Sequence, residues 1–144
     1  MVNSEFGRCH PQADLIVAGA RACVGSRFRP QGRGPGGFDC LGVVLAAALC
    51  AGIRLHPRSD YALGSCPADE VLLGLADLGC RILAVSPSPG DLAVSVPAPG
   101  HVHFAVLTDI GLVEAHAGLR RVIERRMAAD DIWHSIWRLP LEGF

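Results

Sequence analysis

The stretch GPGGFDCLGVVLAAALC, residues 34–50, joins a loop rich in glycine and proline to a long apolar run, and Cys40 lies at the junction. Residues 40–51 are apolar on nearly all sides of a helix, which predicts a buried helix that stops at Gly52. At the first turn, the Cys40 thiol would lie beside unpaired backbone amides and the positive end of the helix dipole. Both effects favour a thiolate and so suit a nucleophile. A buried cysteine without chemistry at a helix start fits the spacing equally well.

Elsewhere the chain places helices first and strands afterwards. Two further helices are expected, at 11–24 and 67–79, with a loop at 25–39 and irregular structure at 53–65. Five short runs rich in β-forming residues then follow, separated by turn sequences: 91–96, 102–108, 112–117, 120–126 and 133–138. A single helical turn is expected at 127–132. This order predicts an α+β fold with an antiparallel sheet.

Length and composition exclude several classes of protein. The chain has 144 residues, half of them hydrophobic and 19% charged, which predicts one ordered domain with a core at about 11–140. The net charge of −1 gives no basic excess, so nucleic acid is not expected as a main partner. No apolar run approaches the roughly 20 residues of a membrane span. The start, MVNSEFGRCHPQ, lacks the apolar segment of a usual signal peptide.

The cysteines and glycines do not indicate a metal or a cofactor. Because no export sequence is visible, we expect the six cysteines to be reduced and buried as small hydrophobes. Neither C-x-x-C nor H-x-x-x-H occurs, and Cys9 and His10 lack further ligands at suitable spacing. The segment GRGPGG follows a helix rather than a strand and contains proline, unlike a dinucleotide-binding loop. The expectation is therefore no metal and no cofactor.

A nucleophilic cysteine needs a base, and the segment GHVHFAVLTDIGLVEAHAG offers candidates. His101 and His103 are two residues apart, so on a strand they face the same side. Glu114 and His116 have the same relation on the following strand. A hairpin would set one histidine of the first strand opposite a polar residue of the second, which gives a thiol, an imidazole and a group that orients it. The alternative is that all of them are solvent-facing strand residues.

Four segments, in order, resemble the NlpC-type cysteine peptidases of bacterial cell walls. They are FDCLGVV after the glycine-rich loop, PSPGDLAV, HFAVLTDIGLVEAHAG and RRVIE. Their order and spacing are most similar to the phage-tail branch of the family, which also occurs in prophages and gene transfer agents. The resemblance extends over residues 13–140. It implies a papain-like fold, in which the helix that carries the nucleophile packs on an antiparallel sheet that supplies the histidine.

The resemblance also assigns roles to residues. Cys40 matches the family nucleophile, and Asp39 matches a preceding acidic residue with a structural role. His103 fits the position of the base better than His101, which stays the second choice.

For the third residue, His116 matches the family's "HA" with one extra residue in the turn, and Glu114 is the alternative. Phe28 stands where the family often has a tyrosine whose hydroxyl helps to form the site.

The implied reaction is hydrolysis of an amide in the peptide stem of peptidoglycan, often the bond between D-γ-glutamate and a diamino acid. The resemblance further implies synthesis in a bacterial cytoplasm and delivery to the cell wall without a signal peptide, through a phage-like tail or lysis. Two alternatives remain. One is an inactive family member that serves as a structural component of a tail tip, and the other is an amidase or acyltransferase on the same fold.

A basic run at Arg120, Arg121, Arg125 and Arg126 suits a solvated face, or contact with a partner protein or an anionic wall polymer.

Overall fold

The structure is a computed structural model that describes residues 10–56, 68–84 and 86–142. It confirms the α+β class and the antiparallel pairing. The described helices are α2 (Pro11–Ala22), α3 (Cys40–Cys50) and α4 (Ala68–Asp77). No helix in these ranges is both long enough and apolar enough to cross a bilayer.

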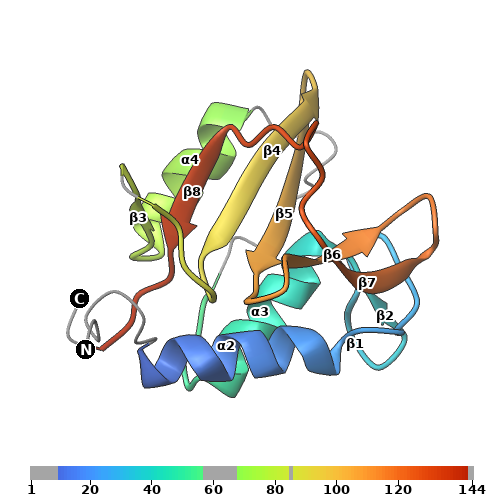
Figure 1. Ribbon diagram of the computed structural model, residues 1–144, viewed down its shortest axis with the longest axis horizontal. Helices are drawn as coiled ribbons and strands as arrows, with labels where there is room; N and C mark the ends of the chain where they lie inside the picture. Colours follow the sequence, from blue (N-terminus) through green and yellow to red (C-terminus); the bar gives the residue numbers. More distant parts are fainter. Residues whose placement is uncertain (1–9, 57–67, 85, 143–144) are drawn as a thin grey trace.

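A six-stranded antiparallel sheet, in the order β3-β8-β4-β5-β6-β7, forms the second half of the chain (Figure 1). Its strands are β3 (Arg81–Ile82), β4 (Leu92–Ala98), β5 (His101–Leu107), β6 (Leu112–His116), β7 (Arg121–Arg125) and β8 (Ser135–Arg138). β5 and β6 pair only at Val106–Val113 and Leu107–Leu112. The two strands therefore part beyond that point, on the side where β5 begins and β6 ends.

Helices α2 and α3 pack on each other and against the sheet, and α3 contacts both β5 and β6 (Figure 1). The main core lies between these layers and includes Ile16 of α2, Val43 of α3 and Phe104 of β5, each at most 2% exposed. On the other face of the sheet, a smaller apolar cluster around Leu107 is covered by Trp133. The first turn of α3 is thus fixed against the strands where they part.

The start of α3 is set by its flanking residues. Asp39 has an extended backbone and caps the helix, because its carboxylate accepts the amide of Gly42 at 2.8 Å. Gly42 itself faces the preceding loop rather than the sheet. A Cβ at this position would lie 2.1 Å from the carbonyl oxygen of Gly32, so only glycine allows this close approach.

Three local expectations from the sequence are wrong. The segment 25–39 is not a plain loop, since it contains the two-stranded sheet of β1 (Arg33–Gly34) and β2 (Gly37–Phe38). Residues 127–132 form no helical turn; Asp131 instead accepts the amide of Ala128 and closes a loop. The short strand β3 was not expected.

The described cysteines are free thiols. Cys23, Cys40 and Cys80 are buried as expected, whereas Cys50 is exposed at the end of α3, so the expectation of burial is wrong for that residue. Cys9 and Cys66 lie outside the described residues.

Candidate active site

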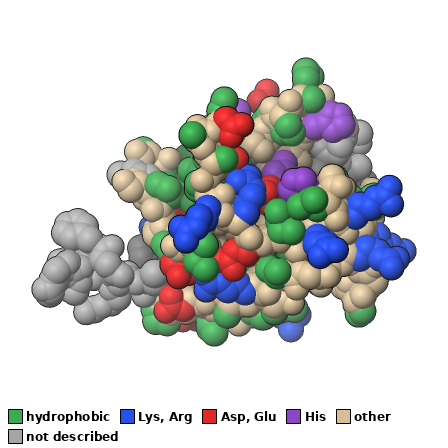
Figure 2. Space-filling model, turned by 45° about the vertical axis from the view of Figure 1, so that its right-hand side comes forward, with side chains coloured by type: hydrophobic (Ala, Val, Ile, Leu, Met, Phe, Trp, Pro, Cys, Tyr) green, Lys and Arg blue, Asp and Glu red, His purple; other side chains and the backbone are tan. Residues whose placement is uncertain are grey.

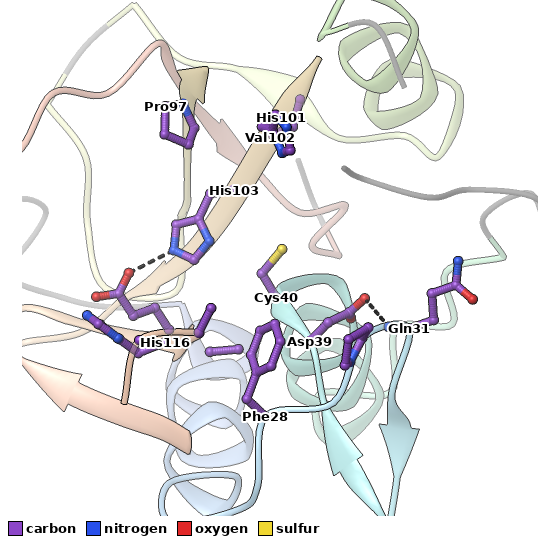
Figure 3. A pocket seen from close by; sticks show the side chains of 14 residues that line it. Phe28, Gln31, Asp39, Cys40, Pro97, His101, Val102, His103 and His116 are labelled. Atoms are coloured by element: carbon purple, nitrogen blue, oxygen red, sulfur yellow. Dashed lines mark hydrogen bonds and ion pairs between the residues drawn. The ribbon is translucent and has the colours of Figure 1, made fainter. Parts of the chain in front are cut away.

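A pocket of about 680 Å³ lies at the first turn of α3, where β5 and β6 part (Figure 3). It collects side chains from the loop before α3, from α3 itself and from strands β4 to β6. The lining residues are Phe28, Pro30, Gln31, Asp39, Cys40, Pro97, His101, Val102, His103, Glu114, Ala115, His116, Ala117 and Gly118. Every candidate site residue from the sequence therefore borders one cavity.

His103 links the two sides of this pocket. Its Nε2 lies 2.7 Å from Oε1 of Glu114, and its ring points toward Cys40 (Figure 3). Because a carboxylate can only accept a hydrogen bond, Nε2 carries the proton in this contact. Nδ1 is then the nitrogen that remains for the Cys40 thiol, and its lone pair can take the thiol proton.

Two opposing effects act on the pKa of His103. Burial alone would lower it, because a low-dielectric environment disfavours the imidazolium. Hydrogen bonding to Cys40 and Glu114, together with their negative charges, outweighs burial and raises the pKa to about 9. The site therefore stabilises a protonated imidazole next to the sulfur.

Glu114 is only 6% exposed, and each of its oxygens has a donor. Oε1 faces His103, and Oε2 accepts from Nε of Arg125. Burial favours the neutral acid, but the hydrogen bonds from His103 and Arg125 keep the pKa of Glu114 below its usual value. Arg125 is held in turn by Asp131, whose two oxygens both lie 2.9 Å from its guanidinium. A chain of alternating charges thus fixes the orientation of the imidazole.

The beginning of α3 supplies backbone donors beside the sulfur. Within the described residues, the amides of Cys40 and Leu41 have no hydrogen-bond acceptor, as expected in the first turn of a helix. Both amides, together with the positive end of the helix dipole, favour negative charge at this point. A carbonyl oxygen that became an oxyanion next to Cys40 would be stabilised there.

Asp39 and Phe28 support the pocket from the side of the loop. The Asp39 carboxylate holds the local backbone in place through three hydrogen bonds. It accepts from the amide of Gly42, from the Gln31 amide at 3.0 Å and from the guanidinium of Arg33 at 2.7 Å. Phe28 is half-buried against the core and lines the cavity with an apolar ring. Asp39 therefore fixes the preceding loop to the start of α3.

The structure brings Glu114, rather than His116, into contact with the imidazole of His103. His116 was the first choice from the sequence, yet its Nδ1 accepts the amide of Leu119 at 3.0 Å, in the turn after β6. Glu114, the alternative, is the residue that contacts the imidazole. His101 is exposed at the start of β5, and Figure 3 shows it farther along the strand from Cys40 than His103.

Arg125 and Asp131 were not found from the sequence. In the sequence, Arg125 belongs to a basic run. Its pairing with Glu114 depends on the register of β6 and β7, in which Leu112 is opposite Arg125 and Glu114 is opposite Ile123. This register sets the guanidinium diagonally beside the Glu114 carboxylate. The alternation of side chains along β7 separates Arg125 from Glu124 but leaves it on the same face as Arg121, so it could not have revealed this pairing by itself.

Comparison with models of known protein families gives no match, and comparison with curated proteins gives none either. Among the residues in 10–56, 68–84 and 86–142, no three His, Cys, Asp or Glu side chains are grouped so that they could hold a metal ion.

Proposed function

We propose that the protein is a cysteine peptidase that hydrolyses an amide bond in the peptide stem of bacterial peptidoglycan. The observation that carries the proposal is the arrangement of Cys40, His103 and Glu114 in an open pocket at the start of α3. Thiol, imidazole and carboxylate in this order supply a nucleophile, a base and a group that orients the base.

The proposed reaction has two stages. Nδ1 of His103 takes the thiol proton, and the Cys40 thiolate attacks the amide carbonyl carbon. The resulting oxyanion is stabilised by the amides at the start of α3. The C–N bond then breaks, the amine leaves with the proton from His103, and a thioester to Cys40 remains. In the second stage His103 takes a proton from water, the hydroxide displaces the thiolate, and the acid product leaves.

The substrate class rests on the resemblance to NlpC-type peptidases. Two of the segments that carry this resemblance include the strands and the helix that border the pocket, which supports the proposal. FDCLGVV forms the end of β2 and the first half of α3, and HFAVLTDIGLVEAHAG forms most of β5 and all of β6. The proposal therefore includes a papain-like fold, cleavage next to D-γ-glutamate, and action in the cell wall after delivery by a phage-like tail or lysis. It requires no metal or cofactor.

Digestion of purified muropeptides, followed by mass spectrometry, tests this proposal. The wild-type protein should yield fragments with a new amine and a new carboxyl group, which together add one water to the substrate. Cys40→Ala and His103→Ala should abolish these products. Cys50→Ala and His134→Ala are matched controls on exposed residues away from the pocket, and both should retain activity.

The proposal is wrong if the wild-type protein releases no such fragment, or if Cys40→Ala still does. Transfer of the acyl group to an added amine instead of water would point to an acyltransferase on the same site. Absence of all acyl chemistry would favour the structural role in a tail tip.

A further inference from the structure

A row of basic side chains begins at the rim of the pocket and leads away from it. His116 of β6 is paired directly with Arg121 of β7. Arg121 is paired in turn with Arg27, through an isolated antiparallel bridge beside β7. Residues that are opposite each other in a sheet project from the same face. His116, Arg121 and Arg27, the basic row, therefore lie side by side over roughly 10 Å, at a strand spacing of about 4.8 Å.

The two arginines of the basic row lack the carboxylate partners that several other arginines have. Arg21, Arg33, Arg125 and Arg138 each pair with a carboxylate. Arg27 and Arg121 are exposed, and no carboxylate of the described residues faces them. Figure 2 shows arginine side chains gathered near histidines on the side of the molecule that carries β7.

The pairing of Arg27 with Arg121 is unfavourable for the protein alone. Like charges at directly opposite positions of an antiparallel pair repel each other. An anion bound between them would remove this repulsion. His116 adds a donor at the pocket end of the row, because its Nδ1 accepts from Leu119 and its Nε2 therefore carries a proton.

We propose that the basic row binds carboxylate groups of the peptide substrate next to the bond that is cleaved. This inference rests on the proposed function and specifies an acidic peptide as the ligand. The row starts at a pocket-lining residue, so a substrate held at Cys40 reaches it directly. Its length of roughly 10 Å suits one or two carboxylates of a short peptide. A long polyanion would need a longer stripe of charge than the three side chains of the basic row supply.

Binding to an inactive protein tests the inference without catalysis. The probe is a fluorescein-labelled peptide that contains the γ-D-glutamyl–diamino acid bond with free carboxylates, and its partner is the same peptide with these carboxylates amidated. Fluorescence anisotropy with Cys40→Ala should show tighter binding of the acidic peptide, with a preference that declines as salt is added. Adding Arg27→Gln and Arg121→Gln should weaken acidic-peptide binding about 10-fold, as expected for two exposed charge contacts that each contribute somewhat less than about 1 kcal/mol.

The controls distinguish the effect of the basic row from the effect of positive charge elsewhere on the protein. Arg54→Gln removes one exposed positive charge beyond the far end of α3, and it should leave the preference unchanged. The double variant should unfold at the same temperature as its parent or higher, because it loses a like-charge pair.

Three results would overturn the inference: equal binding of the two peptides, a preference that survives the double substitution, or equally tight binding of single-stranded DNA that depends on the same arginines. Hydrolysis by the wild-type protein in parallel samples distinguishes the two proposals. If the amidated peptide is cleaved as efficiently as the acidic one, the proposed function stands and the basic row has no part in recognition.

Discussion

Replacement of Glu114 by glutamine should lower the pKa of His103 and shift the alkaline limit of activity. Glu114 offers two acceptor oxygens, one to His103 and one to Arg125. Glutamine has one acceptor oxygen, and its amide group would face whichever donor that oxygen does not serve. The imidazolium therefore loses either its hydrogen bond or its charged partner, while the shape of the side chain is retained.

The size of the shift follows from the geometry. A hydrogen bond to a charged group contributes about 1.5–3 kcal/mol, and a neutral one about 0.5–1.5 kcal/mol. The difference of about 1–2 kcal/mol, together with the loss of a negative charge in a buried site, corresponds to a shift of about 1–2 units in the pKa of His103. The pKa of His103 should fall from about 9 in the wild-type protein to about 7–8 in the variant. Because the proposed reaction needs His103 protonated to release the amine, activity should decline at a correspondingly lower pH.

An NMR titration of the His103 ring measures this shift directly, and the pH profile of kcat/KM measures its consequence. Glu124→Gln is the matched control, since this carboxylate lies on the neighbouring strand and pairs with Arg21 rather than with His103. It should leave the His103 titration unchanged. The reasoning is refuted if the midpoint for His103 is the same in Glu114→Gln as in the wild-type protein, or if both variants shift it equally.

Three further outcomes are expected. Cys40→Ala should also lower the pKa of His103 in an NMR titration, because Cys40 contributes to raising it; an unchanged midpoint would show that the two side chains do not interact. Asp39→Ala should lower the free energy of unfolding by about 2 kcal/mol, through loss of the helix cap and of the contact with Arg33, whereas Asp39→Asn should retain most of the cap; equal denaturant midpoints for the two variants would contradict this role. Phe28→Tyr should raise kcat/KM for the stem peptide by about 2-fold to 10-fold, the worth of one hydrogen bond, and unaltered kinetics would show that no hydroxyl is needed there.

The sequence predicts the helices and the long strands well because their limits are local. Pro11 begins α2, and Asp39 caps α3 one residue before the expected start of the apolar run. Short runs rich in β-forming residues between turn sequences identify β4 to β8. The hairpin β1–β2 and the strand β3 have two residues in each strand, which is too short for any periodic pattern.

The side chain that contacts the imidazole could not be predicted, because it depends on where β5 and β6 part and on how their side chains are directed there. The letters "HA" favoured His116, and the register of β5 and β6, continued from Val106–Val113, would also set His103 opposite His116. The strands part before that point, and it is the side-chain contact that identifies Glu114 as the partner of the imidazole.

The partner of Arg125 could not be predicted either, because it depends on how β6 pairs with β7. A local run of arginines looks like one surface, whereas the sheet turns Arg125 toward Glu114 and sets Arg121 beside Arg27.

The most direct test of the account is the rate at which iodoacetamide labels Cys40, with the exposed Cys50 at the other end of α3 as internal reference. The adducts can be located by mass spectrometry at a series of pH values. At about pH 6.5, where an ordinary thiol is hardly ionised, Cys40 should react faster than Cys50 despite its burial, and His103→Ala should remove this advantage. If Cys40 reacts more slowly than Cys50 throughout, or if its rate does not depend on His103, the site holds no activated thiol and the proposed peptidase chemistry is wrong.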